Sequence, residues 1–398
     1  MHKASRQNFN AQFSSDTYQQ FLASIHHAYP KQLDFRVAET PVFVPKSFKN
    51  QLLDACEHII SVLTSTDFKG KTEKAIPTGQ NVPHENQNSS FLAIDFAICE
   101  NETGEIEPQL IELQGFPSLF AFQYFLSKQF QNQYPIPDNF DFLFNDLTRP
   151  KYVEFLRNLI VGEEKPENVI LLEIYPETQK TRIDFKVTEE LLGVKAICIT
   201  KIIKKGKLLF YEEEGELVPI KRIYNRLIFD DLANYPELQT AFNFTDNVDV
   251  EWVGHPNWFF RISKYILPLF KHQYIPESHY LSDFQGDFPK DLENYVLKPL
   301  FSFAGSGVKI NITETDLQEV ENPAEYILQR KVNYLPVIET TDGSKVKAEI
   351  RLLYGWEQGA PKPTLLTNLA RLSRGEMIGV RFNKDFDWVG GTVCFMEK

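Results

Sequence analysis

The stretch NYVLKPLFSFAGSGVKI (294–310) combines a lysine and small residues in a pattern suited to phosphate chemistry. Lys298 stands in an apolar segment that reads as a strand, and a loop rich in small residues follows it: Ala304, Gly305, Ser306 and Gly307. Small side chains let backbone N–H groups approach phosphate oxygens, while a strand holds a lysine at a fixed depth. The pattern predicts a triphosphate cradle, although a glycine-containing hairpin can also be only a turn. Since the stretch does not match GxxxxGK[ST], a P-loop is not indicated.

A second strand end with suitable chemistry lies about twenty residues further on, in AEYILQRKVNYLP (324–336). The apolar strand ends near Gln329, and Lys331 and Val332 follow. A strand end of this kind can offer backbone N–H and C=O groups to an adenine edge, with an apolar side chain against the ring. The alternative is an ordinary sheet strand.

Arginines accumulate in the last fifty residues. KAEIRLLYGW places Glu349 and Arg351 on the same face of a strand. The following stretch, NLARLSRGEMIGVRFN, adds further polar residues: Arg371, Arg374, Arg381 and Asn383. Arginines that converge with Lys298 would be a local exception to the acidic composition, as a bound polyphosphate requires. Solvated salt bridges are the competing interpretation.

Oxygen donors suited to a metal lie far upstream. FLAIDFAI (91–98) and PQLIELQ (108–114) read as the two strands of a β-hairpin. Glu112 and Gln114 alternate with Leu113 and therefore share one face, and pairing of the strands can bring Asp95 beside them. Magnesium prefers oxygen ligands, usually one or two carboxylates plus substrate phosphates. The hairpin predicts a magnesium site in outline.

IYNRLIF (223–229) presents two further polar residues near a strand end. Asn225 and Arg226 could bind a substrate carboxylate. The competing interpretation is a capped and salt-bridged turn.

Composition limits the classes of protein that are compatible with this chain of 398 residues. The 42% hydrophobic content excludes general disorder. The net charge of −12 argues against broad nucleic-acid binding, because a phosphate-backbone footprint needs clustered Lys and Arg. The four cysteines form no CxxC pair, and the opening residues have no apolar segment of the secretory type, so we expect a cytoplasmic protein. Without a run of about 18 apolar residues, no membrane span is expected.

The elements that would position these residues fall into three regions. Residues 1–164 are expected to contain helices and the two metal-binding strands, with a long polar loop from Thr66 to Ser90. Residues 165–255 alternate strand and helix patterns, which predicts a small α/β domain with a partly parallel sheet. Residues 256–398 hold the expected nucleotide-binding strands.

Together these motifs resemble the ATP-grasp superfamily, in which two α+β subdomains hold ATP between them. KPLFSFAGSG resembles the family's lysine and phosphate-covering loop, LQRKV its adenine hinge, and IDFAI with IELQGFPSL its metal strands. HPNWFFRISKYILP (255–268) is similar to the segment before the family's first ATP lysine, which would be Lys264. The resemblance implies an α+β ATP-grasp fold with a small α/β substrate domain.

The order of the motifs resembles a circularly permuted branch that includes eukaryotic-type glutathione synthetases, because the metal strands precede the lysines. YVLKPLF also resembles a strand of glutathionylspermidine synthetase-like proteins. The chain departs from these patterns at several positions. Gln114 stands where the family has Asn, Ser302 where glutathione synthetases have a metal-binding Glu, and Phe303 and Ala304 where the second group has Arg and Glu.

The resemblance implies an ATP- and Mg²⁺-dependent ligase that joins a small-molecule or peptide carboxylate to an amine or thiol through an acyl phosphate. Asp95, Glu112 and Gln114 would hold magnesium, and Arg351 and Arg371 would be catalytic. Several residues would contact the nucleotide: Lys264, Lys298, Ser302, Gly305, Ser306, Gly307, Gln329, Lys331 and Val332. The 302–307 loop would close as a lid, since water would hydrolyse an acyl phosphate.

Two other functions remain compatible with the sequence. A nucleotide-binding module without turnover is favoured by the departures at Ser302, Phe303 and Gln114. An ATP-dependent phosphotransferase needs the same ATP site and is not distinguished from a ligase by these motifs.

Overall fold

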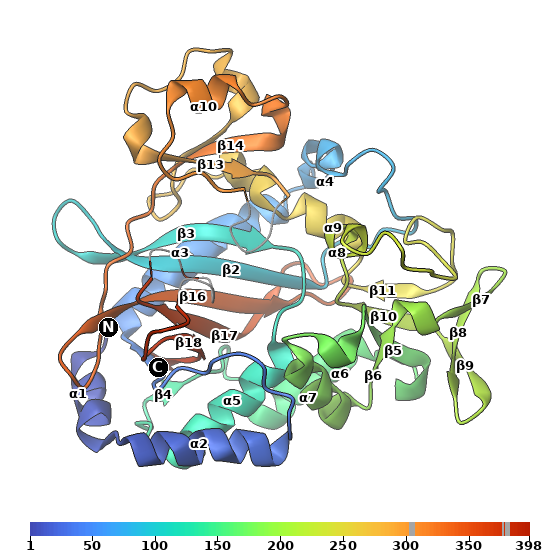
Figure 1. Ribbon diagram of the computed structural model, residues 1–398, viewed down its shortest axis with the longest axis horizontal. Coiled ribbons are helices and arrows are strands. Elements are labelled where there is room, and N and C mark those ends of the chain that lie inside the picture. Colours follow the sequence, from blue (N-terminus) through green and yellow to red (C-terminus); the bar gives the residue numbers. More distant parts are fainter. Residues whose placement is uncertain (302–306, 376–377, 379–382) are drawn as a thin grey trace.

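An antiparallel sheet at the centre of the molecule joins strands from both ends of the chain (Figure 1). The computed structural model describes residues 1–301, 307–375, 378 and 383–398. The central sheet contains, in spatial order, β18 (Gly390–Thr392), β17 (Thr364–Ser373), β16 (Lys345–Gly355), β2 (Phe91–Glu100) and β3 (Ile106–Gln114), with β15 (Ile338–Glu339) paired to β16. β2 and β3 form the hairpin expected from the sequence, which is confirmed.

The two faces of the central sheet differ in character. Successive side chains of β2 alternate between faces, so Ile94 points to one side and Asp95 to the other. α3 (Lys46–Leu63) covers the apolar face, where its Cys56 is hydrogen-bonded to Tyr354 of β16. Tyr354 stands three residues beyond Arg351 on the same strand, and Arg351 is in register with Asp95. The charged side chains therefore lie on the face opposite α3.

Helices from the first half of the chain pack around this sheet. α1 (Lys3–Gln12) and α2 (Ser15–Ala28) are amphipathic, and α5 (Phe120–Gln133) packs against both α2 and β17. A small sheet of β1 (Val42–Val44), β19 (Cys394–Glu397) and β4 (Phe140–Asp141) pairs an early strand with the last one. Parallel pairing of β1 with β19 ties the early part of the chain to its end.

A separate antiparallel sheet stands above β3 in Figure 1. It contains β12 (Ser278–Tyr280), β14 (Tyr326–Arg330) and β13 (Tyr295–Pro299), with α10 (Glu314–Gln318) on one side. Its strands and α10 bury a small core of their own: Leu281, Tyr295, Leu297, Ile312, Leu317 and Leu328. We call residues 276–331 the upper unit. Because it has its own core, it can keep its shape independently of the central sheet.

The parallel sheet expected between residues 165 and 255 is confirmed. Its order is β11 (Glu251–Val253), β10 (Arg222–Asn225), β5 (Val169–Glu173) and β6 (Lys195–Cys198). α6 (Arg149–Ile160) and α7 (Arg182–Leu192) pack beside it, and α8 (Phe229–Ala233) follows β10. An antiparallel sheet of β7 (Ile203–Lys205), β8 (Leu208–Glu213) and β9 (Glu216–Ile220) projects from this unit.

The polar segment from Thr66 to Ser90 is largely held in place. It contains α4 (Phe68–Lys71) and η1 (Glu73–Ala75), and it packs against α9 (Pro256–Arg261). The guanidinium of Arg261 donates to both carboxylate oxygens of Glu85 and to the hydroxyl of Thr72. Because several of its N–H groups are hydrogen-bonded, the buried Arg261 holds this segment against α9, which precedes Lys264 in the chain.

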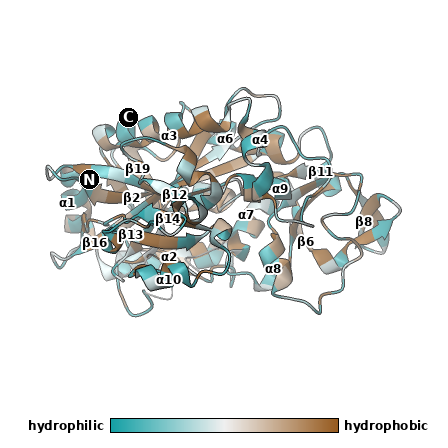
Figure 2. Cartoon of the chain, turned by 90° about the horizontal axis from the view of Figure 1, so that it is seen from above, coloured by the Kyte–Doolittle hydropathy of each residue, from teal (hydrophilic) through white to brown (hydrophobic). Residues whose placement is uncertain are grey.

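Hydrophobic residues concentrate on the strands and inner helix faces, while the connecting loops at the rim are mostly hydrophilic (Figure 2). None of the described helices is long and apolar enough to cross a lipid bilayer. The remaining 3-10 helices are short: η2 (Pro166–Asn168), η3 (Pro176–Thr178), η4 (Ile199–Lys201), η5 (Lys264–Leu269), η6 (Leu281–Phe284), η7 (Leu292–Asn294) and η8 (Pro323–Glu325).

Candidate functional site

A row of charged side chains crosses the open face of the central sheet. Strand register places Arg371 of β17 opposite Glu349 of β16, Arg351 of β16 opposite Asp95 of β2, and Asp95 opposite Glu112 of β3. Directly opposed side chains on neighbouring strands lie close enough to interact. We call these five residues the charged row.

Asp95 is the most enclosed member of the charged row, with 1% of its side chain exposed. Arg351 donates from Nε to Oδ1 and from Nη2 to Oδ2, both at 2.5 Å, and Arg371 Nη2 donates to Oδ2 at 2.9 Å. Burial disfavours the charged form of Arg351, but the pairing with Asp95 prevails and raises the pKa of its guanidinium. Both arginines therefore carry a positive charge on this face.

Glu349 connects Arg371 of the charged row to Tyr334. The Arg371 guanidinium also donates to Glu349 Oε1, and the Tyr334 hydroxyl donates to Glu349 Oε2 at 2.7 Å. Burial raises the pKa of the Glu349 carboxyl, an effect that Arg371 opposes. Sequence reasoning placed Glu349 on the face of Arg351 but gave it no role, and it missed Tyr334. No local pattern marks Tyr334, because it reaches Glu349 from the loop after the upper unit.

Glu112 lies at the β3 end of the row, with 21% of its side chain exposed. Gln114 Nε2 donates to Glu112 Oε1 at 3.0 Å, and Lys264 Nζ lies 3.8 Å from Oε2. Burial lowers the pKa of Lys264, while Glu112 raises it in part. The sequence prediction that Asp95, Glu112 and Gln114 share one face is therefore confirmed in geometry.

A close backbone approach brings Lys264 to this position. Gly115 follows β3, and a Cβ atom there would lie 2.6 Å from the Trp258 carbonyl oxygen. The Gly115 N–H donates to the Ile262 carbonyl at 3.0 Å. Only glycine allows the segment before Lys264 to pack this tightly against the end of β3.

The upper unit contributes a second lysine. Lys298 Nζ donates to Gln329 Oε1 at 2.5 Å and to the Ile111 carbonyl of β3 at 3.4 Å. Burial and the nearby Lys264 cation lower the pKa of Lys298 to about 8. Lys298 therefore bridges the two sheets, and an anion between them would satisfy a cation that is poorly solvated.

The chain is similar to the solved apo structure of GSS30, a glutathione synthetase-like effector from Globodera pallida, with a TM-score of 0.61. The two proteins share 11% sequence identity, and the match covers 97% of this chain and 98% of that chain. The chain therefore has a glutathione synthetase-like fold. No protein-family model matches the sequence, and no curated protein matches it either.

Apart from Lys264 in η5, the nucleotide-binding residues expected from the sequence fall on β13 and β14, on the chain between them, or just after β14. Gln329 is fully buried and its amide donates to Ser278 Oγ at 3.0 Å, so it positions Lys298 from inside the upper unit. Lys331 and Val332 follow β14 as half-buried loop residues, and the Lys331 N–H donates to the Asn294 carbonyl. Their contact with adenine stays a prediction.

Part of the expected phosphate-covering loop falls outside the described residues, namely Ser302, Gly305 and Ser306, as does Arg381. Gly307 is described. Its φ of 69° suits glycine, and a Cβ atom there would lie 2.8 Å from Pro299 Cγ. Glycine is therefore required where the chain passes β13.

Asn225 and Arg226 lie at the carboxyl edge of the parallel sheet, beside the charged row. Arg226 Nη1 donates to Asp184 Oδ2 at 2.7 Å and to the Ser118 carbonyl at 3.2 Å. Arg351 Nη1 donates to the Ser118 hydroxyl at 3.2 Å, so Ser118 connects the two groups of residues. Within the described part of the chain, Asn225 Nδ2 and Arg226 Nε have no hydrogen-bond partner. Their contact with a substrate stays a prediction.

Sequence reasoning missed Glu173, which ends β5 next to this edge. Burial raises the pKa of its carboxyl to about 7, and the charge of Arg226 lowers it in part. A buried carboxyl with a strongly raised pKa at the edge of a site is a candidate functional group. Its position as the last residue of the otherwise apolar strand VILLE was the available signal.

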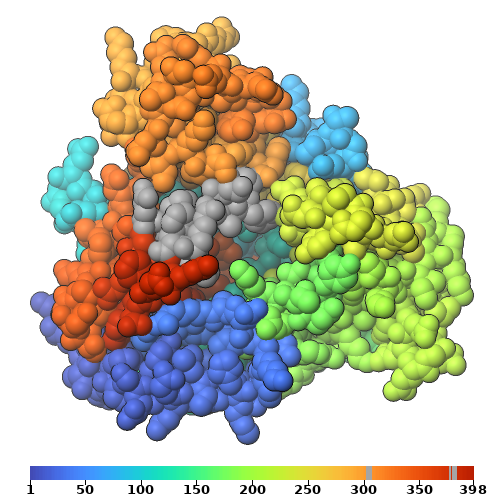
Figure 3. Space-filling view, in the orientation of Figure 1, coloured from blue at the N-terminus to red at the C-terminus, as the bar shows by residue number. Residues whose placement is uncertain are grey.

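A cavity of about 20 Å³ lies between Glu112, Lys264 and Phe301. This volume holds about one water molecule, whereas small-molecule sites typically occupy about 300 to 1,000 Å³. A nucleotide would therefore require the upper unit to separate from β3. Figure 3 shows the orange upper unit above the red C-terminal residues and the green α/β unit on this side of the molecule.

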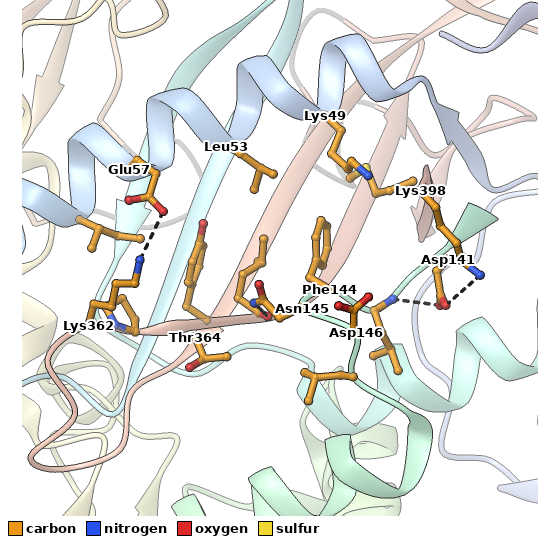
Figure 4. A pocket seen from close by; sticks show the side chains of 17 residues that line it. Lys49, Leu53, Glu57, Asp141, Phe144, Asn145, Asp146, Lys362, Thr364 and Lys398 are labelled. Carbon is orange, nitrogen blue, oxygen red and sulfur yellow. Dashed lines mark hydrogen bonds and ion pairs between the residues drawn. The ribbon is translucent and has the colours of Figure 1, made fainter. Parts of the chain in front are cut away.

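A larger groove of about 540 Å³ lies on the α3 side of the sheet (Figure 4). Its rim carries the ion pairs Lys362–Glu57 and Lys398–Asp141, each with 3.7 Å between nitrogen and oxygen. Tyr354 forms part of its lining and points away from the face of Arg351. The sheet itself separates this groove from the charged row.

The three residues expected to bind magnesium, Asp95, Glu112 and Gln114, suit that ion only in part. Within residues 1–301, 307–375, 378 and 383–398, no group of three or more His, Cys, Asp or Glu side chains is arranged to hold a metal ion. Glu112 and Gln114 nevertheless place a carboxylate and a side-chain amide next to each other, and magnesium needs only one or two carboxylates when substrate phosphates complete its shell. Both oxygens of Asp95 already accept hydrogen bonds from guanidiniums.

Proposed function

We propose that this protein is an ATP- and magnesium-dependent ligase that joins a carboxylate to an amine or thiol through an acyl phosphate. The observation that carries the proposal is the convergence of cationic side chains from separate elements on one face: Lys264, Lys298, Arg351 and Arg371. In a chain with a net charge of −12, these four cations outnumber the three carboxylates of the charged row, and binding of a polyphosphate requires such a local positive excess. We further propose that the fold is a circularly permuted ATP-grasp arrangement.

Each group has a place in such a reaction. Lys298 and Lys264 lie above β3, where the upper unit meets the central sheet, and would hold the phosphates. Arg351 and Arg371 lie further across the sheet and would stabilise negative charge that develops on the transferred group. Glu112 and Gln114 would hold magnesium, which neutralises phosphate charge when bound. Phosphoryl transfer needs such alignment and charge neutralisation more than a protein nucleophile.

The substrate side would be formed by the edge of the parallel sheet. Asn225 and Arg226 carry donors without partners among the described residues, which suits a substrate carboxylate. Adenine would lie against β14, near Lys331 and Val332. Closure of the upper unit would then exclude water from an acyl phosphate.

A nucleotide-binding module without turnover is the second candidate. It is favoured by Asp95, because both of its carboxylate oxygens are occupied by arginines. The Gln114 amide nitrogen also donates a hydrogen bond to Glu112 Oε1, which leaves fewer oxygen atoms available to bind a metal ion.

Incubating the protein with ATP, magnesium and a panel of amino acids and peptides, and measuring ADP release, distinguishes the candidates. The ligase releases ADP and phosphate only when ATP, magnesium, an acid and an amine or thiol are all present, and mass spectrometry detects the joined product. A phosphotransferase gives ADP and a phosphorylated acceptor without free phosphate. Tight ATP binding with no ADP from any acceptor supports the module and contradicts the ligase.

A further inference from the structure

Asp95 has a different environment from Glu112, although the resemblance to ATP-grasp proteins implies that both residues bind magnesium. Three hydrogen bonds from Arg351 and Arg371 reach the Asp95 carboxylate, whose side chain is 1% exposed. A carboxylate offers about four acceptor positions. Three of them are occupied here, and burial keeps water from the fourth.

Magnesium is poorly suited to such a carboxylate. The ion demands near-ideal octahedral geometry and keeps several of its waters, so it needs accessible oxygens. An ion at Asp95 would also stand beside two guanidiniums that remain charged.

Glu112 is suited to the same ion. Its two ion-pair partners, Lys264 and Arg351, both lie 3.8 Å away, and 21% of its side chain is exposed. These contacts are long enough to be exchanged for a cation, and Gln114 lies at 3.0 Å to add an amide oxygen after rotation.

We propose, on the basis of the proposed function, that Asp95 is a positioning residue rather than a metal ligand. It holds the planes of Arg351 and Arg371 toward an anionic group of the substrate, and the metal is held from Glu112 and Gln114. The two-pronged contact with Arg351 fixes that guanidinium, and Arg371 is shared between Asp95 and Glu349. Arg371 keeps 37% of its side chain exposed, so it can contact an anion while it is held. Preorganised guanidiniums stabilise developing charge without reorganising during the reaction.

Metal binding measured apart from turnover tests this assignment. Electron paramagnetic resonance gives the Mn²⁺ affinity of the full-length protein with ATP present, and calorimetry gives ATP affinity with Mg²⁺ or with EDTA. Glu112→Gln should weaken Mn²⁺ binding tenfold or more. Asp95→Asn should change Mn²⁺ affinity less than threefold, yet weaken ATP binding in Mg²⁺ and in EDTA alike. Glu105→Gln, in the exposed β2–β3 turn, is the control for loss of a negative charge.

A double-mutant cycle provides the second measurement. If Asp95 acts through Arg351, Asp95→Asn should add little to the loss of ATP affinity in Arg351→Gln, but should multiply with Glu112→Gln. The double variant Asp95→Asn, Arg351→Gln removes both buried charges together. It replaces Asp95→Asn in the binding measurements if the single variant does not fold. Circular dichroism and thermal unfolding check each variant.

The outcomes separate this assignment from the proposed function. If wild type binds ATP and Mn²⁺ but Asp95→Asn loses Mn²⁺ as strongly as Glu112→Gln, the positioning role is wrong and the ligase proposal stands. If wild type binds neither ATP nor Mn²⁺, both are wrong. Independent effects of Asp95→Asn and Arg351→Gln would also overturn the positioning role.

Discussion

Lys298 Nζ lies 2.5 Å from Gln329 Oε1, and the two residues come from neighbouring antiparallel strands of the upper unit. Gln329 is fully buried and is itself held by Ser278, so it points the ammonium at β3 of the central sheet. The contact between the two sheets thus includes a cation positioned by a buried amide. This arrangement would let the upper unit bring a fixed positive charge onto a ligand when it closes.

Replacing Lys298 with Ala should weaken ATP binding about 10- to 100-fold, since a hydrogen bond to a charged group contributes about 1.5 to 3 kcal/mol. The fold should persist, because the side chain ends between the sheets and not in the core of the upper unit. Calorimetry with Mg²⁺ and ATP measures the affinity. Lys290→Ala, at an exposed position of the same unit, should leave it unchanged. If the Lys298→Ala protein and the wild type bind ATP with equal affinity, Lys298 does not contribute to ATP binding.

The pH dependence of ATP binding should report the same lysine. Its folded-state pKa is about 8, against about 10.4 for an unperturbed lysine. Above about pH 8 the ammonium loses its proton, so ATP affinity should fall by up to about tenfold per pH unit. Lys298→Arg should keep its affinity to higher pH, because arginine stays protonated. A flat wild-type profile between pH 7 and 9.5 contradicts this prediction.

The lowered pKa of Lys298 affects stability in the opposite direction: ATP affinity should fall as the pH rises, but the stability of the fold should increase. Between about pH 8 and 10 the unfolded chain binds more protons at Lys298 than the folded protein does. This residue therefore makes the free energy of unfolding rise with pH across that window. Urea unfolding of wild type and Lys298→Met at pH 8 and 10 isolates the contribution, and the rise should be smaller in the variant.

Glu112→Gln should reduce magnesium-dependent turnover more than nucleotide binding. Metal ions supply several kcal/mol of charge stabilisation to the transition state, so we expect a loss of about 100-fold or more in kcat. The amide keeps the shape of the side chain and removes its charge. Steady-state ADP release at several magnesium concentrations measures the effect. Loss of ATP affinity equal to the loss of turnover would instead assign Glu112 to nucleotide binding.

Asp184→Asn should destabilise the fold by about 3 to 5 kcal/mol. Asp184 and Arg226 are paired at 2.7 Å with 1% and 7% of their side chains exposed, so the change leaves a buried guanidinium without its counter-ion. Urea unfolding measures the difference. The exposed pair Lys186–Glu189 on the same helix is the matched control, and Lys186→Ala should cost less than about 1 kcal/mol. A small effect of Asp184→Asn would show that Arg226 finds another partner.

Local patterns in the sequence determined much of the architecture. The apolar runs and the polar turn of residues 91–114 predict the β2–β3 hairpin, and alternation along it places Asp95, Glu112 and Gln114 on one face. Such predictions succeed because strand pairing across a short turn and side-chain alternation are set by neighbouring residues.

Only the tertiary structure decided what these side chains contact. Asp95 meets Arg351 and Arg371 because β2 pairs with β16, more than 250 positions away, and β16 pairs with β17. No local pattern records that pairing. Tyr334 reaches Glu349 from a loop, and Arg226 is neutralised by Asp184 from a helix. Burial and charge pairing depend on all the elements packed around a group, so whether a carboxylate holds a metal or an arginine is settled by the assembled fold.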